Sequence, residues 1–224
     1  MLTRRGFVSR VAGSLTAVLP LDLPLPSRIE KRPGRVLLDL GEQCGLPESL
    51  SGYAGALAGL PVRATRADAQ SLARCTLLIV PAAVGLAPSA VGAIVSCLRA
   101  GGTVLLESGA GFASPQEYQL HRAMLRDYFG IHVGAAVTLW SPPLSRGIPY
   151  VDYTWPCRAR IRDFSRVAPL EEQGEIIARV DGLPVSLKRC SRRGTLIFLG
   201  SPLGPALWAG DVDAKRWLCH LVAR

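Results

Sequence analysis

The sequence predicts an α/β protein in which helices flank a parallel sheet and the C-terminal third adds antiparallel strands. Three observations lead to this prediction. Apolar, strand-like runs alternate with helical segments between residues 35 and 130. One of these runs, CTLLIVP (75–81), is almost wholly apolar, as is typical of a central parallel strand covered on both faces. After about residue 132, the pattern changes to short alternating runs separated by turn residues.

The first elements of the parallel sheet alternate along the chain. RVLLDL (35–40) is a short apolar strand, and PESLSGYAGALAGL (47–60) has the spacing of a helix. PVRATRA (61–67) is a second, more exposed strand, which precedes the central run at 75–81. APSAVGAIVSCLRAGG (87–102) is predicted as a helix that starts near its second residue, a proline, and ends at the glycine pair.

A further strand and helix complete this half. TVLLES (103–108) is the strand, and SPQEYQLHRAMLRDYFG (114–130) is the helix. Ser114 is the predicted N-cap, Glu117 completes a capping box three residues later, and Gly130 ends the helix. This β-α-β-α order predicts parallel strands joined by right-handed crossovers, with helices on both faces of the sheet.

The C-terminal third reads as antiparallel or mixed strands. The strand-like runs lie at 158–167, 175–190 and 194–202, and Asp181-Gly182 supplies a hairpin turn within the second. An amphipathic helix, DVDAKRWLCHLVAR (211–224), closes the chain. Because no internal repeat or second core is evident, residues 33–224 are predicted to form a single domain.

The N-terminus resembles an export signal. Thr3-Arg4-Arg5-Gly6-Phe7-Val8 is similar to the twin-arginine motif, whose core is Ser/Thr-Arg-Arg-x-Phe-Leu/Val, so Arg4, Arg5 and Phe7 are the expected signal residues. The mild apolar stretch that follows is too short to span a bilayer and suits a signal segment. We therefore predict that residues 1–32 are a signal and Pro-rich linker, and that the protein is periplasmic or tethered through this segment. A basic tail is the alternative.

Charge and cysteine usage exclude some functions. The formal net charge is +9, but residues 1–32 hold six basic and two acidic side chains, which leaves twenty basic against fifteen acidic residues elsewhere. No basic stripe interleaved with aromatic residues is present, so nucleic-acid binding is not predicted. The six cysteines lack C-x-x-C and zinc spacing, so most are expected in the core, with Cys157 and Cys190 the pair to test for a disulfide.

The central segment resembles a known superfamily. CTLLIVPAAVGLAPSAVGAIVSCLRAGGTVLLESGAG (75–111) is similar to the centre of the class I glutamine amidotransferase-like superfamily, where a strand ends in a Pro-Gly-Gly-like turn, here Pro81-Ala82-Ala83. The non-catalytic version that forms the trimerisation domain of certain β-galactosidases is similar at Gly101-Gly102-Thr103-Val104 and at Ser108-Gly109. The resemblance extends over roughly 35–224 and implies a flavodoxin-like parallel sheet.

The catalytic residues of that superfamily are changed in this chain. Catalytic members carry a Cys at the turn, where this chain has Glu107-Ser108-Gly109-Ala110-Gly111, and a His and a Glu after a late strand, where it has Gly200-Ser201-Pro202-Leu203. The resemblance therefore implies a non-catalytic domain without cofactor or metal, acting in ligand binding or assembly. The expected partners are a second copy of the chain, another exported protein, or a small ligand such as a carbohydrate.

Ser108 leaves a second function open, that of a serine-dependent hydrolase or amidase, with Glu107 assisting. A serine needs a base beside it. The histidines are His121 in the middle of a helix, His132 at the start of a strand and His220 in the last helix, and the predicted fold places none of them beside residue 108. The Gly-x-Ser-x-Gly context is also missing. We therefore favour a turn whose residues are small because the chain bends sharply.

Glu107 has its own interpretations. It ends an apolar strand at the carboxyl edge of the sheet, where open α/β folds place ligands. It is predicted either to accept hydrogen bonds from a ligand or to be a salt-bridged structural carboxylate. Asp39 and Glu42 follow the first strand at the same edge, so the three acids could form a loose cluster that holds a cation.

Aromatic residues gather between residues 139 and 156, in LWSPPLSRGIPYVDYTWP. Such side chains suit sugar stacking or a partner chain, or alternatively a loop that packs over the sheet. The stretch 201–211 is expected beside the same edge. The predicted ligand-binding set comprises Glu107, Ser108, Gly109, Trp140, Tyr153, Trp155 and Ser201.

Overall fold

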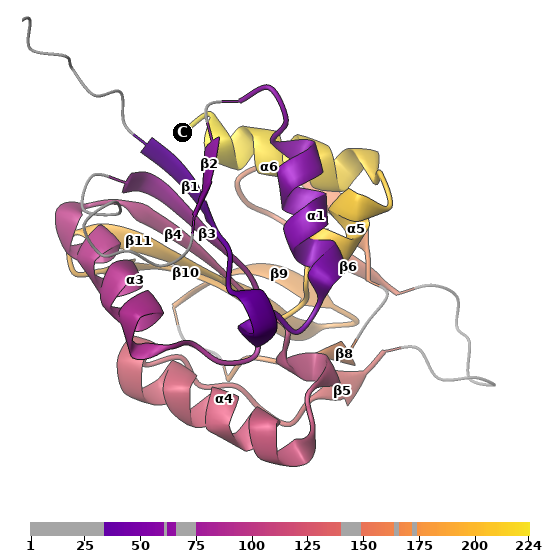
Figure 1. The fold of residues 1–224 in the computed structure, drawn as a ribbon. Helices are drawn as coiled ribbons and strands as arrows, with labels where there is room; N and C mark the ends of the chain where they lie inside the picture. The colour runs from indigo at the N-terminus through magenta and orange to yellow at the C-terminus, as the bar shows by residue number, and fades with distance from the viewer. Residues whose placement is uncertain (1–33, 61, 66–74, 140–148, 164–165, 172–173) are drawn as a thin grey trace, which may run out of the picture. The chain divides into compact units, whose positions relative to one another are not determined.

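One large mixed sheet organises the part of the chain that the structure describes (Figure 1). The computed structural model describes residues 34–60, 62–65, 75–139, 149–163, 166–171 and 174–224. In spatial order the nine strands are β2 (Val62–Thr65), β1 (Gly34–Leu38), β3 (Cys75–Ala83), β4 (Thr103–Ser108), β11 (Gly194–Leu199), β10 (Leu183–Ser191), β9 (Glu175–Val180), β6 (Tyr150–Tyr153) and β7 (Ala159–Arg162).

The sheet has a parallel half and an antiparallel half, as the sequence predicts. Strands β2, β1, β3, β4 and β11 run parallel to their neighbours. From β11 onward, each pair through β10, β9, β6 and β7 is antiparallel. Asp181 and Gly182 turn the chain between β9 and β10, and both have positive φ. The late strands therefore extend the same sheet, and β5 (Val137–Thr138) pairs with β8 (Arg166–Val167) in a small second sheet.

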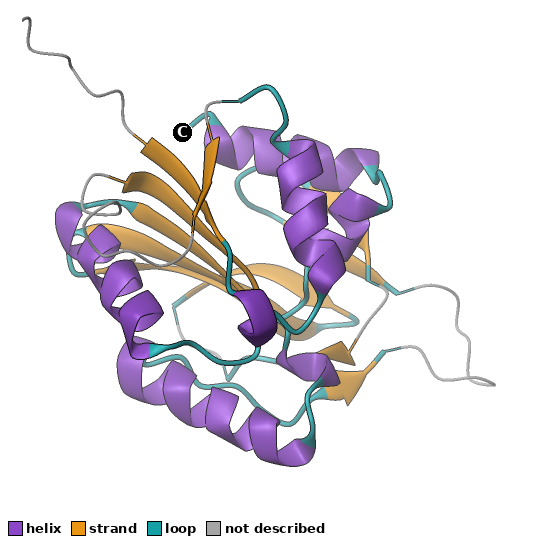
Figure 2. Ribbon diagram, viewed as in Figure 1, coloured by secondary structure: helices purple, strands orange, loops and turns teal. Residues whose placement is uncertain are grey.

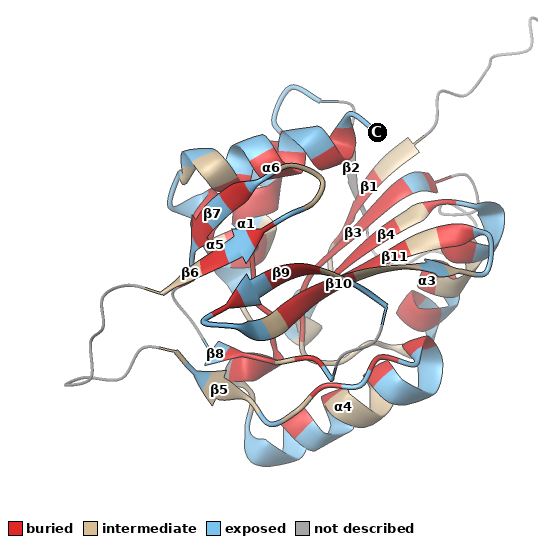
Figure 3. Cartoon of the chain, turned by 180° about the vertical axis from the view of Figure 1, so that it is seen from behind, coloured by how far each residue is buried: buried red, intermediate tan, exposed pale blue. Residues whose placement is uncertain are grey.

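Helices cover both faces of the sheet (Figure 2). One face carries α3 (Pro88–Ala100) and α4 (Pro115–Phe129), and the other carries α1 (Pro47–Ala56), α5 (Gly204–Trp208) and α6 (Val212–Val222). Strand β3 shows why the central strands are apolar throughout: Leu78 and Val80 pack in the first layer, whereas Leu77 and Ile79 pack in the second. Figure 3 shows the resulting concentration of buried residues along the strands.

The helix ends follow the predicted signals. Helix α4 begins at a capping box, in which Ser114 accepts from the Glu117 backbone N–H and the Glu117 carboxylate accepts from the Ser114 N–H. Gly101 and Gly130 end α3 and α4 in the left-handed conformation. Asp211 caps α6 by accepting from Ala214 N at 2.9 Å. Among the described residues, no helix combines the length and apolar character required to cross a membrane.

Candidate functional site

The turn after β4 brings a serine and a histidine together. Ser108 ends β4, and the chain passes through the short 3-10 helix η2 (Ala110–Phe112) into α4. His121 lies on the buried face of α4, in the helical register of Tyr118 and Leu125. Its Nε2 is 3.0 Å from Ser108 Oγ. The expectation that no histidine lies beside residue 108 is therefore wrong, because α4 packs back over the turn that precedes it.

The hydrogen bonds around this pair define its protonation. His121 Nδ1 lies 2.9 Å from Val84 O, and a carbonyl oxygen can only accept, so Nδ1 carries the proton. Nε2 is then the acceptor for the Ser108 hydroxyl. Ser108 Oγ in turn accepts from Ala110 N at 3.3 Å, and Gly109 N donates to Ala83 O at 2.9 Å. The two amides that follow the serine are thus already bonded, which leaves neither to stabilise an oxyanion.

Burial makes this pair a weak catalytic unit. Ser108 is 2% exposed and His121 is 1% exposed. Burial lowers the pKa of His121 to about 4, and the hydrogen bond to the Val84 carbonyl offsets this only in part. A general base works best when its pKa lies near the operating pH, so this imidazole is a poor base for activating serine at neutral pH. The geometry instead fits a satisfied polar contact between β4 and α4.

Glu107 connects three elements at the same edge. Its Oε1 accepts from Ser49 Oγ on α1 and from Gly204 N at the start of α5, both at 3.0 Å. The Tyr53 hydroxyl is close enough to lower the pKa of Glu107, although it and Glu107 Oε2 do not meet hydrogen-bond geometry. Burial is the largest influence and raises the pKa of Glu107 to about 7. Glu107 is therefore a buried structural carboxyl, held by a hydroxyl and an amide rather than by the predicted salt bridge.

Backbone segments approach one another closely at the carboxyl edge. A Cβ on Gly109 would collide with Ala82 O, so this turn residue is small because there is no space for a side chain. Its backbone conformation does not require glycine, since any residue can adopt its φ of −95°. A Cβ on Gly52 of α1 would collide with Gly204 O of α5. The predicted ligand-binding role of Glu107, Ser108 and Gly109 at an open edge is not supported by this packing.

The other predicted site residues lie in different places. Ser201 is buried and donates to Asp163 Oδ2 at 2.6 Å. Tyr153 is buried against Trp217 at 5.0 Å between ring centroids, and burial raises the pKa of Tyr153. The ligand-binding role of Ser201 and Tyr153 therefore stays a prediction, for two side chains that this structure buries. Trp140 lies outside the described residues, whereas Trp155 is half-buried at a groove on the opposite edge.

The acid cluster does not form. Asp39 Oδ1 accepts from Gly41 N at 2.9 Å, Glu42 is exposed, and Glu107 is buried as described. No group of three or more metal-ligating side chains occurs in the described ranges of the chain. All six cysteines are free, and only Cys75 and Cys97 are buried, so the expectation of mostly core cysteines is wrong.

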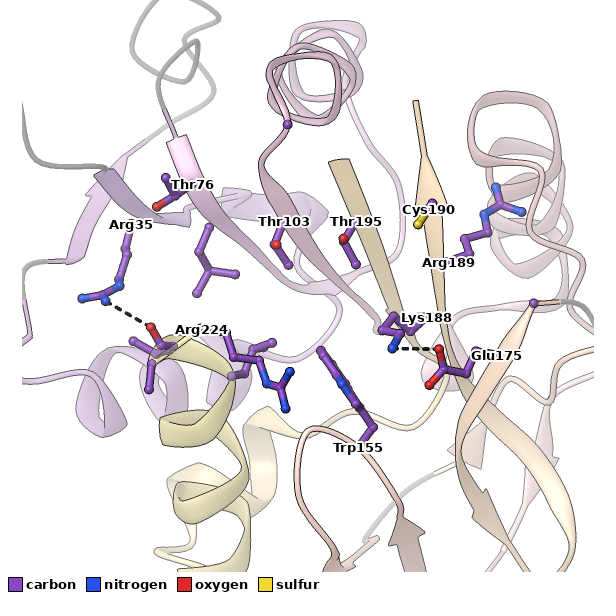
Figure 4. A pocket seen from close by; sticks show the side chains of 16 residues that line it. Arg35, Thr76, Thr103, Trp155, Glu175, Lys188, Arg189, Cys190, Thr195 and Arg224 are labelled. Carbon is purple, nitrogen blue, oxygen red and sulfur yellow. Dashed lines mark hydrogen bonds and ion pairs between the residues drawn. The ribbon is translucent and has the colours of Figure 1, made fainter. Parts of the chain in front are cut away.

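A groove of about 940 Å³ opens at the amino edge of the parallel strands (Figure 4). Sequence reasoning missed it because ligands were expected at the carboxyl edge. The signal was present: a polar residue stands at the first or second position of four neighbouring strands. These residues are Arg35, Thr76, Thr103 and Thr195. Trp155, Lys188, Glu175 and Arg224 line the groove as well.

Comparisons with known proteins support the fold. No protein-family model and no curated protein sequence matches the chain. A β-galactosidase from Rahnella sp. R3 is similar with a TM-score of 0.61 and 15% identity, over 85% of this chain and 31% of that one. A β-galactosidase from Bacillus circulans sp. alkalophilus is similar with a TM-score of 0.58 and 15% identity, over 82% of this chain and 31% of that one. The chain thus spans about a third of these enzymes.

A third similar structure has nearly the length of this domain. It is the cytoplasmic protein STM1381 from Salmonella typhimurium LT2, with a TM-score of 0.54 and 12% identity, over 84% of this chain and 98% of that one. At such identities the likeness establishes a shared fold alone.

Proposed function

We propose that this chain is an exported, non-catalytic domain with the flavodoxin-like fold of the glutamine amidotransferase-like superfamily, acting in ligand binding and protein assembly. The observation that carries the non-catalytic role is the burial of Ser108 and His121 against each other. The resemblance supports the same conclusion, because residues 107–111 hold no Cys and residues 200–203 hold neither the His nor the Glu of the catalytic members. Arg4, Arg5 and Phe7 support export, although they lie outside the described residues.

The likeness to parts of β-galactosidases supports an assembly role. Each such enzyme is about three times as long as the matched segment, so the segment is one part of a larger protein there. In this chain, two large apolar side chains are strongly exposed at the corner between α5 and α6: Trp208 at 63% and Val212 at 76%. Exposed apolar residues that lie together are a feature of protein interfaces. We therefore assign self-association to this corner.

Light scattering tests the assembly role. We expect the full chain at high concentration to show a mass that is a multiple of 23.9 kDa. The double change Trp208→Ser and Val212→Ser is expected to shift the protein towards monomer. It should raise the dissociation constant for self-association by at least about tenfold. Leu120→Ser is the matched control, because Leu120 is 66% exposed on α4, on the other face of the sheet. A monomer at every concentration contradicts the assembly role.

A serine-dependent hydrolase is the second candidate, and one observation favours it. Ser108, His121 and the Val84 carbonyl form a continuous hydrogen-bonded chain in the order that a nucleophile, a base and an orienting acceptor require. Catalysis would require α4 or the β4 turn to move so that Ser108 meets substrate. Covalent reaction at Ser108 in the folded protein would support this candidate.

A further inference from the structure

The amino-edge groove concentrates positive charge. Three basic side chains, Arg35, Lys188 and Arg224, line it against one acidic side chain, Glu175. The guanidinium of Arg189 points away from the groove, because it donates to Gly130 O at 3.0 Å. The basic residues come from distant parts of the sequence: β1, β10 and the end of the chain after α6. Figure 4 shows Trp155 between Arg224 and Lys188. The charge is therefore a product of the fold rather than of a basic run in the sequence.

Neutral groups hold two of these cations in place. Arg35 Nη2 donates to Val222 O at 3.0 Å, and Arg224 Nη2 donates to Pro156 O at 3.4 Å. A backbone carbonyl fixes the direction of a guanidinium without cancelling its charge. A guanidinium carries five N–H donors, and these bonds use only one on each arginine. The remaining donors and the full charge stay available to an acidic group.

Trp155 positions the cations further. The guanidinium carbon of Arg224 lies 5.1 Å from the Trp155 ring centroid, and Lys188 Nζ lies 4.7 Å from it. Both distances fall within the range of cation–π contacts. Lys188 also pairs with Glu175 at 2.7 Å, so its charge is partly balanced. Arg35 and Arg224 are consequently two separate anchors for anions, and Lys188 lies on the other side of Trp155 from Arg224 in Figure 4.

Hydroxyl groups and a carboxylate complete the groove. Thr103 and Thr195 stand side by side in the register of β4 and β11, and their side chains lie on the floor in Figure 4. The Glu175 carboxylate can accept hydrogen bonds from a ligand that carries hydroxyl groups. The volume of about 940 Å³ is at the upper end of what small-molecule pockets occupy, and it exceeds what one inorganic ion would fill.

We propose that this groove binds an acidic saccharide, a sugar that carries two or more carboxylate or phosphate groups. One acidic group meets Arg224 and Lys188 at Trp155, a second pairs with Arg35, and sugar hydroxyls meet Thr103, Thr195 and Glu175. This inference deepens the ligand-binding part of the proposed function. It can fail independently, because the assembly corner at Trp208 is not among the residues that line the groove.

Calorimetric titration of the full chain tests the proposal with four probes: trigalacturonate, fructose 1,6-bisphosphate, neutral maltotriose and inorganic phosphate. We expect one of the two acidic sugars to bind at one site per chain, with an affinity that falls as salt is added. Binding of trigalacturonate would identify carboxylates as the acidic groups of the ligand, and binding of fructose 1,6-bisphosphate would identify phosphates. Maltotriose and inorganic phosphate are expected to bind at least about tenfold more weakly.

Variants locate the binding. The double variant Arg35→Ala and Arg224→Ala is expected to lower the affinity for the acidic sugar by about tenfold or more, because charge-assisted hydrogen bonds are lost. Arg224→Ala alone is expected to lower that affinity about threefold. Because Arg224 is exposed, this single variant replaces the double variant in the test if the double variant does not fold. Arg216→Ala on α6 is the matched control, because Arg216 is basic, exposed and outside the groove.

Several results would overturn the proposal. These are no binding of either acidic sugar, equal binding of maltotriose or inorganic phosphate, or an equal loss in the Arg216→Ala control. In each case, the mass measured by light scattering still reports separately on assembly.

Discussion

Replacing Glu107 with alanine is expected to lower the free energy of unfolding by about 4 kcal/mol, because several buried groups lose their partner at once. The Ser49 hydroxyl and the Gly204 amide would remain buried without the Oε1 acceptor that both now share. The carboxyl would also leave a cavity between β4, α1 and α5. Urea denaturation at pH 6 measures the loss. A change below 1 kcal/mol would contradict the role assigned to this carboxyl.

Glu107→Gln separates the effect of charge from that of shape. In the folded protein the pKa of Glu107 is raised to about 7, above its ordinary value of 4.5. The stability that this shift contributes is fully present below pH 4.5 and is lost as pH rises through 7. The free energy of unfolding of the glutamine variant, measured relative to that of the wild type, is therefore expected to rise by on the order of 3 kcal/mol between pH 4 and pH 8.

His121 produces the opposite pH dependence in both proteins. Its folded pKa is lowered to about 4 from 6.5, so the unfolded chain takes up a proton first and stability falls as pH drops from 6.5 towards 4. The difference between Glu107→Gln and the wild type cancels this contribution. A difference that stays constant across the pH range would show that the Glu107 carboxyl is not shifted.

Gly52→Ala is expected to destabilise the protein by about 3 kcal/mol, although alanine is the better helix former. The new Cβ would collide with Gly204 O, and backbone cannot move aside as a flexible side chain can. Gly55→Ala is the matched control on the same helix, since a Cβ there meets nothing within 4 Å. It is expected to be neutral or to stabilise by up to about 1 kcal/mol. Thermal unfolding of both variants checks the contact, and equal stabilities would argue against it.

The local elements could be predicted from the sequence because their signals are local. The capping residues Ser114 and Glu117 satisfy each other within one helical turn, and Gly101 and Gly130 end their helices as expected. The mixed sheet also follows, since alternation of strands and helices dictates parallel pairing and the Asp181-Gly182 turn dictates antiparallel pairing. Similarity of 75–111 to a known superfamily pointed to the same α/β layers.

The candidate sites were harder to predict, because they depend on how elements pack. His121 shares a helical face with Tyr118, Leu125 and Phe129, and that spacing was the available sign that it points into the core. Its contact with Ser108 depends on the angle at which α4 returns over the sheet, which the sequence does not specify. The lining of the groove likewise includes both Arg35 and Arg224, which stand near opposite ends of the described sequence.

Labelling of the folded protein with a fluorophosphonate probe, followed by mass spectrometry, tests most directly whether Ser108 is locked away from substrates. We expect no adduct on Ser108 of the wild-type protein at pH 7.5. An established serine hydrolase, labelled in parallel, serves as the positive control. An adduct that forms on Ser108 in the folded chain, and that disappears in Ser108→Ala, would contradict the non-catalytic account and establish the hydrolase instead.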